Sequence, residues 1–383
     1  MDRRGWPLPA AGDGFPVSPH RIAVLAGDGI GPEVVEAALP VLEAAAGLEG
    51  VDLDWVHFPW GCDHWQATGR MMPEDGLDRL RPFDAIFLGA VGRPDVPDHV
   101  SVRGLILPIR RAFDQYVNLR PMELLPGLSP VLAGRGGAPF SPESFRMVCV
   151  RENSEGEYVG LGGRFDQGTR DERAEQLSVF TRRGIERVAR YAFRLADGRP
   201  RRLLASATKS NAWQHAMVLW DEVVEEVARD FPRVSWRPYH VDALAARMVS
   251  HPDSLDVILA SNLFGDILSD LGAALTGSLG LAPGANLNPE GTHPSMFEPI
   301  HGSAPDIAGQ GIANPIGTIW AGALMLDHLG AQGAAGRVER ALRAVVADGT
   351  VLTPELGGRA GTMEVAEAVR LRLADAGGAP PPS

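Results

Sequence analysis

The sequence predicts an α/β fold with a largely parallel sheet. Short apolar runs of strand length alternate along the chain with longer segments in which apolar residues recur at helical spacing. Such alternation is typical of strand–helix–strand units, whose strands pair in parallel. With 383 residues, of which 45% are hydrophobic and 22% charged, the chain is long enough for two domains or one large one.

The strands are predicted from apolar runs, taken in chain order. Residues 21–27 form a continuous apolar run, which is typical of a buried strand, and residues 51–58 alternate between apolar and polar side chains. Residues 83–90 form a second continuous run. Further runs predict strands at residues 145–152, 177–181, 203–208, 234–241 and 255–260.

Helices are predicted between and after these strands. Residues 32–45 have helical spacing and begin with a proline, which the first helical position tolerates. The same spacing predicts helices at residues 184–195, 213–229, 243–249, 263–275, 318–329, 334–347 and 362–373. Residues 126–143, rich in Pro and Gly, predict a long loop or hairpin, and the terminal segments 1–20 and 375–383 predict disorder.

Composition excludes several classes of protein. The net charge of −12 and the lack of a basic block argue against a nucleic-acid surface. Two cysteines, Cys62 and Cys149, provide neither a disulfide framework nor metal-ligand spacing. No stretch has the length of a membrane span, and residues 1–20 lack the apolar core of a signal peptide. We therefore expect a cytoplasmic protein without a membrane partner.

Two glycine-rich runs differ in what they predict. Residues 26–34 follow a strand and open a helix, but the final spacing of the G-x-G-x-x-G fingerprint is missing, and so is a convincing acidic residue about twenty positions later. A Rossmann fold is therefore not expected. Residues 298–315 contain many helix and strand breakers and are interpreted as a ligand-holding loop.

Lys209 is the only lysine of the chain, whereas every other strongly basic residue is arginine. Arginine cannot lose its proton in a protein, but a lysine can when its pKa is shifted by its surroundings. Lys209 is therefore either a proton carrier in catalysis or a surface lysine retained by chance.

A pair of aspartates stands out on the predicted helix at residues 263–275. Asp266 and Asp270 are four residues apart, which places both carboxylates on one helix face. They either face solvent or bind a hard cation such as Mg²⁺ or Mn²⁺. Their apolar flanks favour the second interpretation, and Asp242, which follows another strand, is a possible third ligand.

Arginines and a tyrosine supply further candidates. Arg120 and Arg151 both end apolar strands, and Arg110 follows an apolar run. Guanidinium groups bind carboxylates in a bidentate manner, so the pattern suits a small polyacid, although any single arginine could equally be a solvated surface group. Tyr158 is either a proton donor or an aromatic that packs in a turn.

Several blocks, in order along the chain, resemble the β-decarboxylating dehydrogenases, the family of isocitrate, 3-isopropylmalate, D-malate and tartrate dehydrogenases. The similarity covers residues 21–373 and is carried by the blocks GDGIGPEV (27–34), NLRP (118–121), RENSEGEY (151–158), NLFGDILSDLG (262–272) and EPIHGSAPDIAGQGIANP (298–315). Further blocks at residues 72–77, 96–101, 178–184, 206–211 and 286–290 most resemble the tartrate and D-malate members.

The resemblance implies an isopropylmalate dehydrogenase-like α/β fold of two domains that is not a Rossmann fold. Residues 21–115 and 278–374 would form the large cofactor-binding domain, and residues 116–277 the small domain for substrate and dimerisation, with the site between them. Family members are homodimers with shared sites. By position, Lys209 and Asp242 of each chain would serve the site of the other chain.

The resemblance also implies the role of each site residue. Lys209 would act as the base for the C2 hydroxyl of a 2-hydroxy acid, and Tyr158 would protonate the enol carbon after loss of CO₂. The carboxylate that is lost would be held by Arg110, Arg120 and Arg151. Mg²⁺ or Mn²⁺ would be held by Asp266, Asp270 and Asp242 of the partner subunit, and K⁺ is a candidate additional cofactor.

For the dinucleotide, the resemblance implies NAD. Asp306 occupies the position that contacts the adenosine ribose in NAD-dependent relatives, and a carboxylate there would repel the 2′-phosphate of NADP. The expected cofactor contacts are Glu298, His301, Gly302, Ser303, Ala304, Asp306 and Asn314.

The substrate is expected to be D-malate or tartrate, with 3-isopropylmalate as the alternative. Isopropylmalate enzymes carry an acidic residue and a leucine pair in the segment at residues 98–110, whereas this chain has no acid between Asp98 and Asp114. Arg103 stands where the malate and tartrate enzymes usually carry a bulky neutral residue. Two other readings are a metal- and polyacid-binding paralogue without redox chemistry and a Mg²⁺-dependent lyase that works without NAD.

Overall fold

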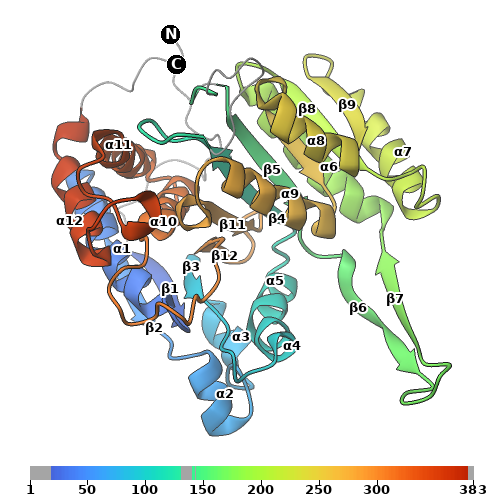
Figure 1. Ribbon diagram of the computed structural model, residues 1–383, viewed down its shortest axis with the longest axis horizontal. Helices are drawn as coiled ribbons and strands as arrows, with labels where there is room; N and C mark the ends of the chain where they lie inside the picture. Colours follow the sequence, from blue (N-terminus) through green and yellow to red (C-terminus); the bar gives the residue numbers. More distant parts are fainter. Residues whose placement is uncertain (1–18, 131–139, 143, 378–383) are drawn as a thin grey trace.

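The computed structural model describes residues 19–130, 140–142 and 144–377 (Figure 1). The disorder predicted at residues 1–18 and 378–383 lies outside the described residues, as does most of the loop predicted at residues 126–143. Two boundaries are wrong: His20 already belongs to the first strand, and Asp375–Gly377, predicted as tail, form a 3₁₀ turn.

A ten-stranded mixed sheet runs through the molecule in the order β2-β1-β3-β12-β11-β4-β5-β10-β8-β9. Its outer parts are parallel, and the contacts β12–β11, β11–β4 and β4–β5 are antiparallel. The strands are β1 (His20–Gly27), β2 (Leu53–His57), β3 (Ala85–Ala90), β4 (Val117–Glu123), β5 (Arg146–Glu152), β8 (Leu203–Thr208), β9 (Ser235–His240), β10 (Val257–Ala260), β11 (Pro283–Leu287) and β12 (Ser295–Pro299). The prediction of an α/β fold is confirmed.

Helices cover both halves of this sheet (Figure 1). The half that contains β1, β2 and β3 carries α1 (Gly31–Leu48), α2 (Cys62–Thr68), α3 (Gly76–Leu80), α4 (Asp98–Ser101), α5 (Leu107–Ala112), α10 (Ile316–His328), α11 (Gln332–Asp348) and α12 (Thr362–Arg372). The half that contains β5, β8, β9 and β10 carries α6 (Arg182–Gly198), α7 (Ala216–Ala228), α8 (Val241–Ser250) and α9 (Asn262–Leu275). No helix in the described ranges is long and apolar enough to cross a membrane.

A separate two-stranded ribbon projects from the second half of the molecule (Figure 1). It consists of β6 (Gly156–Phe165) and β7 (Arg173–Val179), which pair only with each other. Several large apolar side chains on it are exposed, among them Leu161 and Leu177. A lone two-stranded ribbon is marginally stable in water, and exposed apolar side chains of this kind are typical of an interaction surface.

Glycines allow α9 to approach the sheet closely. A Cβ added at Gly265 would lie 2.6 Å from Cβ of Arg151 on β5, and one added at Gly272 would lie 2.1 Å from Sδ of Met122 on β4. Both glycines lie seven residues apart on one helix face, so this face rests directly on the two strands. The close contact brings the polar residues of α9 within reach of the arginines of β4 and β5.

Candidate active site

Asp266 and Asp270 share one face of α9, as their spacing predicts. Ser261 caps the helix, its hydroxyl accepting from the backbone N–H of Phe264. The side chain of Asp266 is 33% exposed and that of Asp270 is 57% exposed, so both carboxylates are accessible to a ligand.

Arg120 lies between the two carboxylates. Its Nη1 is 3.2 Å from Oδ1 of Asp266 and 3.5 Å from Oδ1 of Asp270, and it donates to Oγ of Ser269 at 2.7 Å. Burial raises the pKa of Asp270, whereas for Asp266 the opposing charges of Arg151 and Arg120 outweigh burial and hold its pKa below the ordinary value. Arg120 lies within β4 rather than at its end, where the sequence pattern placed it.

Arg151, on β5, is the most deeply buried arginine of the cluster. It forms an ion pair with Asp266, and its Nε and Nη2 donate to Oδ1 of Asn262 at 3.0 and 2.7 Å. Its pKa is lowered, first by burial and then by the positive charges of Arg120 and Arg110. Three guanidinium groups therefore crowd one region, which favours binding of an anion there.

Arg110 and Glu298 form a buried ion pair at the edge of this cluster. Nη2 of Arg110, on α5, donates to Oε1 of Glu298 at 3.0 Å, and Asn286 donates to the same oxygen at 2.8 Å. The sequence placed Glu298 in a segment too rich in breakers to be core, which is wrong for this residue: it lies buried on β12. Its carboxylate orients Arg110.

The side chain of Tyr158 points at Asp266. Its hydroxyl donates to Oδ2 of Asp266 at 2.8 Å, and the guanidinium of Arg151 lies over its ring at 5.4 Å from the centroid. Burial and the Asp266 carboxylate raise the pKa of Tyr158, which keeps the phenol protonated at neutral pH. The structure thus brings together six of the predicted residues: Arg110, Arg120, Arg151, Tyr158, Asp266 and Asp270.

Lys209 and Asp242 lie apart from this cluster and pair with each other. Lys209 follows β8, Asp242 is near the start of α8, and Nζ of the lysine donates to Oδ1 of the aspartate at 2.7 Å. That hydrogen bond lowers the pKa of Asp242. Within the described part of the chain, neither residue forms a hydrogen bond or ion pair with the cluster, and no three acidic, His or Cys side chains gather as a metal site.

The loop predicted to hold the cofactor follows β12 and rests on the start of α1. The N–H of Ile30 donates to the carbonyl of Ser303 at 2.8 Å, and Glu33 accepts from the N–H of Ala313 at 3.2 Å. Nε2 of His301 and Nδ2 of Asn314 are buried without a hydrogen-bond partner among the described residues. Burial lowers the pKa of His301, so its imidazole is neutral at pH 7.

Some residues that shape these sites were missed by sequence reasoning. Asp28 accepts from the backbone N–H groups of Cys62 and Gly92, both at 2.8 Å, and so ties the glycine-rich turn to two neighbouring loops. Asn262 and Ser269 hold the arginines, as described above. All three lie inside blocks that were recognised, but only the fold reveals their partners.

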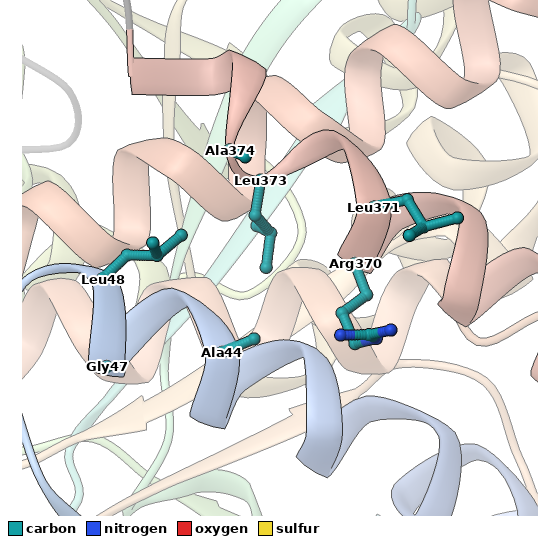
Figure 2. Close-up of a pocket in the computed structure, with 7 residues that line it drawn as sticks. All are labelled: Ala44, Gly47, Leu48, Arg370, Leu371, Leu373 and Ala374. Atoms are coloured by element: carbon teal, nitrogen blue, oxygen red, sulfur yellow. The ribbon is translucent and has the colours of Figure 1, made fainter.

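One apolar surface hollow is unrelated to this chemistry. It has a volume of about 430 Å³ and lies between α1 and the end of α12 (Figure 2). Aliphatic side chains such as Leu48 and Leu373 line it together with Arg370, and none of the predicted site residues is among them.

The chain is similar to known proteins over most of its length. Residues 21–369 match the model of the isocitrate/isopropylmalate dehydrogenase family. A probable tartrate dehydrogenase/decarboxylase of Agrobacterium vitis is 54% identical over 351 residues, covering 91% of this chain and 96% of the relative. The decarboxylating D-malate dehydrogenase of Escherichia coli is 52% identical over 356 residues, covering 91% and 97%.

A solved structure gives the same result for the fold. The isocitrate dehydrogenase of Methylococcus capsulatus superposes with a TM-score of 0.83 at 38% identity, covering 92% of this chain and 99% of the other. The family predicted from the sequence blocks is thereby confirmed. This chain belongs to the isocitrate/isopropylmalate dehydrogenase family.

Proposed function

We propose that this protein oxidises and decarboxylates a 2-hydroxy diacid, D-malate or a tartrate, with NAD and a divalent metal ion. The observation that carries the proposal is the cluster of three buried arginines facing Tyr158 and Asp266. Relatives at 50–54% identity are tartrate and D-malate enzymes. Guanidinium groups bind carboxylates in a bidentate manner, so a cluster of three suits a substrate with two carboxylates.

The described residues fit a divalent cation. Asp266 and Asp270 offer accessible carboxylate oxygens, the donors that Mg²⁺ and Mn²⁺ prefer, and Asp270 has only one long contact, 3.5 Å, to Arg120. Two carboxylates make an incomplete set of protein ligands. We infer that Asp242 of the partner subunit supplies the third, which accounts for its separation from the cluster in one chain.

The described residues also fit a dinucleotide. The unpartnered buried atoms Nε2 of His301 and Nδ2 of Asn314 lie in the loop after β12. Because Nδ1 of the neutral His301 ring donates to the carbonyl of Gly302, its Nε2 is an acceptor, so an adenine would supply a donor for His301 and an acceptor for Asn314. A side chain added at Gly302 would meet nothing within 4 Å, so the loop is open to a ligand there. Asp306 is exposed and would bond ribose hydroxyls while repelling a 2′-phosphate, which favours NAD over NADP.

In the proposed oxidation, Lys209 of the partner subunit first releases a proton to solvent, and its amine then takes the proton of the C2 hydroxyl. When bound, the nicotinamide would accept the hydride from C2, and the divalent ion would polarise the C2 oxygen as a Lewis acid. Arg110, Arg120 and Arg151 hold the carboxylate at C3 that is to leave. Lysine suits the first role because it can release and regain a proton, which arginine cannot.

The second half of the reaction is loss of CO₂ and protonation of carbon. The C3–carboxylate bond breaks, its electron pair forms the enol, and Tyr158 delivers a proton to C3 as the enol reverts to the ketone. The hydrogen bond from Tyr158 to Asp266 holds the phenol at the edge of the cluster, protonated before the step. The products are CO₂, a 2-keto acid and NADH.

We propose a homodimer in which each site is shared. The apolar side chains exposed on the β6–β7 ribbon and on α9, including Leu177 and Ile267 at 60% and 56% exposure, would be covered by the second chain. The same contact would bring the Lys209–Asp242 pair of one subunit to the cluster of the other. Closed two-fold symmetry then produces two equivalent sites.

Arg103 bears on the choice of substrate. It is exposed on the π-helical turn Val102–Ile106, and a Cβ on Gly160 of β6 would lie 3.8 Å from its Nη2. It has no carboxylate partner within the described residues. A free cation beside the Tyr158 strand favours a polar diacid over 3-isopropylmalate, whose apolar branch would gain nothing from it.

The proposal is tested by NADH formation with Mn²⁺, K⁺ and NAD⁺ against D-malate, L- and meso-tartrate, 3-isopropylmalate and isocitrate. Turnover of D-malate or a tartrate well above the others, with NADP⁺ a poor replacement for NAD⁺, is the expected result. A dominant rate with 3-isopropylmalate would keep the chemistry and change the substrate. Metal binding without any NADH would favour the non-redox paralogue, and CO₂ release without NADH would favour the lyase.

A further inference from the structure

The pairing of β6 with β7 is interrupted at the point where Tyr158 lies. Gly156 pairs with Val179 of β7, but the next pair along β6 is Leu161 with Leu177, so residues 157–160 have no partners in the ribbon. Irregularities of this kind bend a strand and re-aim its side chains. Because the ladder does not hold this stretch, other contacts must fix the direction of the phenol.

Two side chains provide those contacts. Nη2 of Arg111 donates to the carbonyls of Tyr158 and Val159 at 3.1 and 3.2 Å. Glu157 uses both carboxylate oxygens on α9: Oε1 accepts from Oγ of Ser261 at 2.8 Å, and Oε2 accepts from the N–H of Leu263 at 3.1 Å.

The Glu157 contact joins the two elements that carry the reacting groups. Ser261 is the N-cap of α9, and the N–H of Leu263 is among the first four of the helix, which have no intrahelical acceptor. A carboxylate at this end is also favoured by the helix dipole. One residue further along β6, the Tyr158 hydroxyl reaches Asp266 on the first turns of the same helix at 2.8 Å.

We propose that Glu157 is a positioning residue that sets the place of the Tyr158 phenol relative to Asp266 by fastening the irregular part of β6 to the N-terminus of α9. Without the Glu157 carboxylate, Asp266 and Tyr158 are both still present, but they can move relative to one another. This inference rests on the proposed function, because its readout is turnover.

The chain contains a matched control two residues earlier. Glu155 also holds a helix start with both oxygens: Oε1 accepts from the N–H of Thr181 at 2.8 Å, and Oε2 accepts from its hydroxyl at 2.9 Å. Thr181 is the N-cap of α6, which carries none of the proposed site residues. Glu155→Gln therefore removes an equivalent cap without touching the tyrosine–aspartate geometry.

The experiment is a double-mutant cycle on the full-length dimer with the best substrate of the panel. Glu157→Gln is expected to lower kcat about tenfold with KM changed less than about threefold, since a small misplacement of a reacting group is costly. In a Tyr158→Phe background the same substitution should change kcat less than about twofold, because it acts through the missing hydroxyl. Glu155→Gln should lower the thermal midpoint while leaving kcat within about twofold in both backgrounds.

The outcomes separate the inference from the proposed function. Full additivity of Glu157→Gln and Tyr158→Phe, or wild-type kcat in Glu157→Gln, would overturn the inference alone. Wild-type protein inactive on every acid would overturn the proposed function and the inference with it. Should Glu157→Gln not fold, Ser261→Ala removes one of the two hydrogen bonds and should show a smaller, equally non-additive loss of kcat.

Discussion

Lys209 is the residue whose chemical type the proposal constrains most. It would accept and release a proton, which a guanidinium cannot do at any accessible pH. Lys209→Arg keeps the charge and the ion pair with Asp242 but should lower kcat by roughly 10²–10⁴-fold. The check is steady-state NADH formation at saturating substrate, with dimer mass and thermal midpoint as controls. A variant with a tenth or more of the wild-type kcat would show that Lys209 carries charge rather than protons.

The types of the site residues could be recognised from the sequence more readily than their contacts. The lone lysine, the DxxxD pair and the arginines at apolar runs each indicate chemistry by themselves, and the structure gathers Asp266, Asp270 and three arginines. What the sequence could not provide is pairing across long separations. Arg120 is 146 residues from Asp266, and Tyr158 is 108 residues from it, so only the fold decides that they meet. The roles of all these residues remain predictions.

At the scale of elements, helices and strands with a strong, uninterrupted sequence pattern were predicted well, whereas strands with an interrupted pattern were missed. The helices α6, α9, α10, α11 and α12 lie close to their predicted ranges. Strand β11 was missed because Pro283 and Gly284 broke the pattern of an otherwise fully buried run, and β12 because the loop that follows it dominated the interpretation. Tertiary burial overrides weak strand propensity in both cases.

The β6–β7 ribbon supplies the prediction at this scale. Leu161 and Leu177 face each other in register and are 51% and 60% exposed. Leu161→Lys with Leu177→Glu should keep a cross-strand pair while removing the apolar surface, and so should convert the dimer to monomer at micromolar concentration. Sedimentation velocity measures this.

Leu371, on α12 and 64% exposed, provides the control for that experiment. Leu371→Glu changes an exposed leucine of the hollow in Figure 2, away from the ribbon, and should leave the mass unchanged. A double ribbon variant that still sediments as a dimer would place the interface elsewhere.

Stability of the whole molecule should depend on Asp327, a partly buried residue of α10. Burial and the nearby Glu339 raise its pKa to about 7, against roughly 3.9 in an unfolded chain. From about pH 4 to about pH 7 the folded chain thus holds a proton that the unfolded chain has released, so this contribution to stability is lost as pH rises. His328, whose pKa burial lowers from 6.5 to about 4, acts in the opposite direction over most of that range.

Comparing Asp327→Asn with the wild type isolates the contribution of Asp327 to the free energy of unfolding, because both proteins contain His328 and Glu339. Asp327→Asn does not titrate, so its free energy of unfolding relative to wild type should increase by about 1–3 kcal/mol from pH 5 to pH 8. Denaturant unfolding at the two pH values provides the measurement. A difference that does not change with pH would mean that Asp327 is ionised throughout.

The central claim concerns two chains at once: the cluster of one subunit and the Lys209–Asp242 pair of the other form one decarboxylating site. The most direct test mixes Lys209→Ala and Asp266→Asn, each inactive alone, under conditions in which subunits exchange. Shared sites predict that hybrid dimers regain one intact site, so that activity returns to about one quarter of the wild-type value. A mixture that exchanges subunits but stays inactive would contradict the claim, because each site would then be built from a single chain.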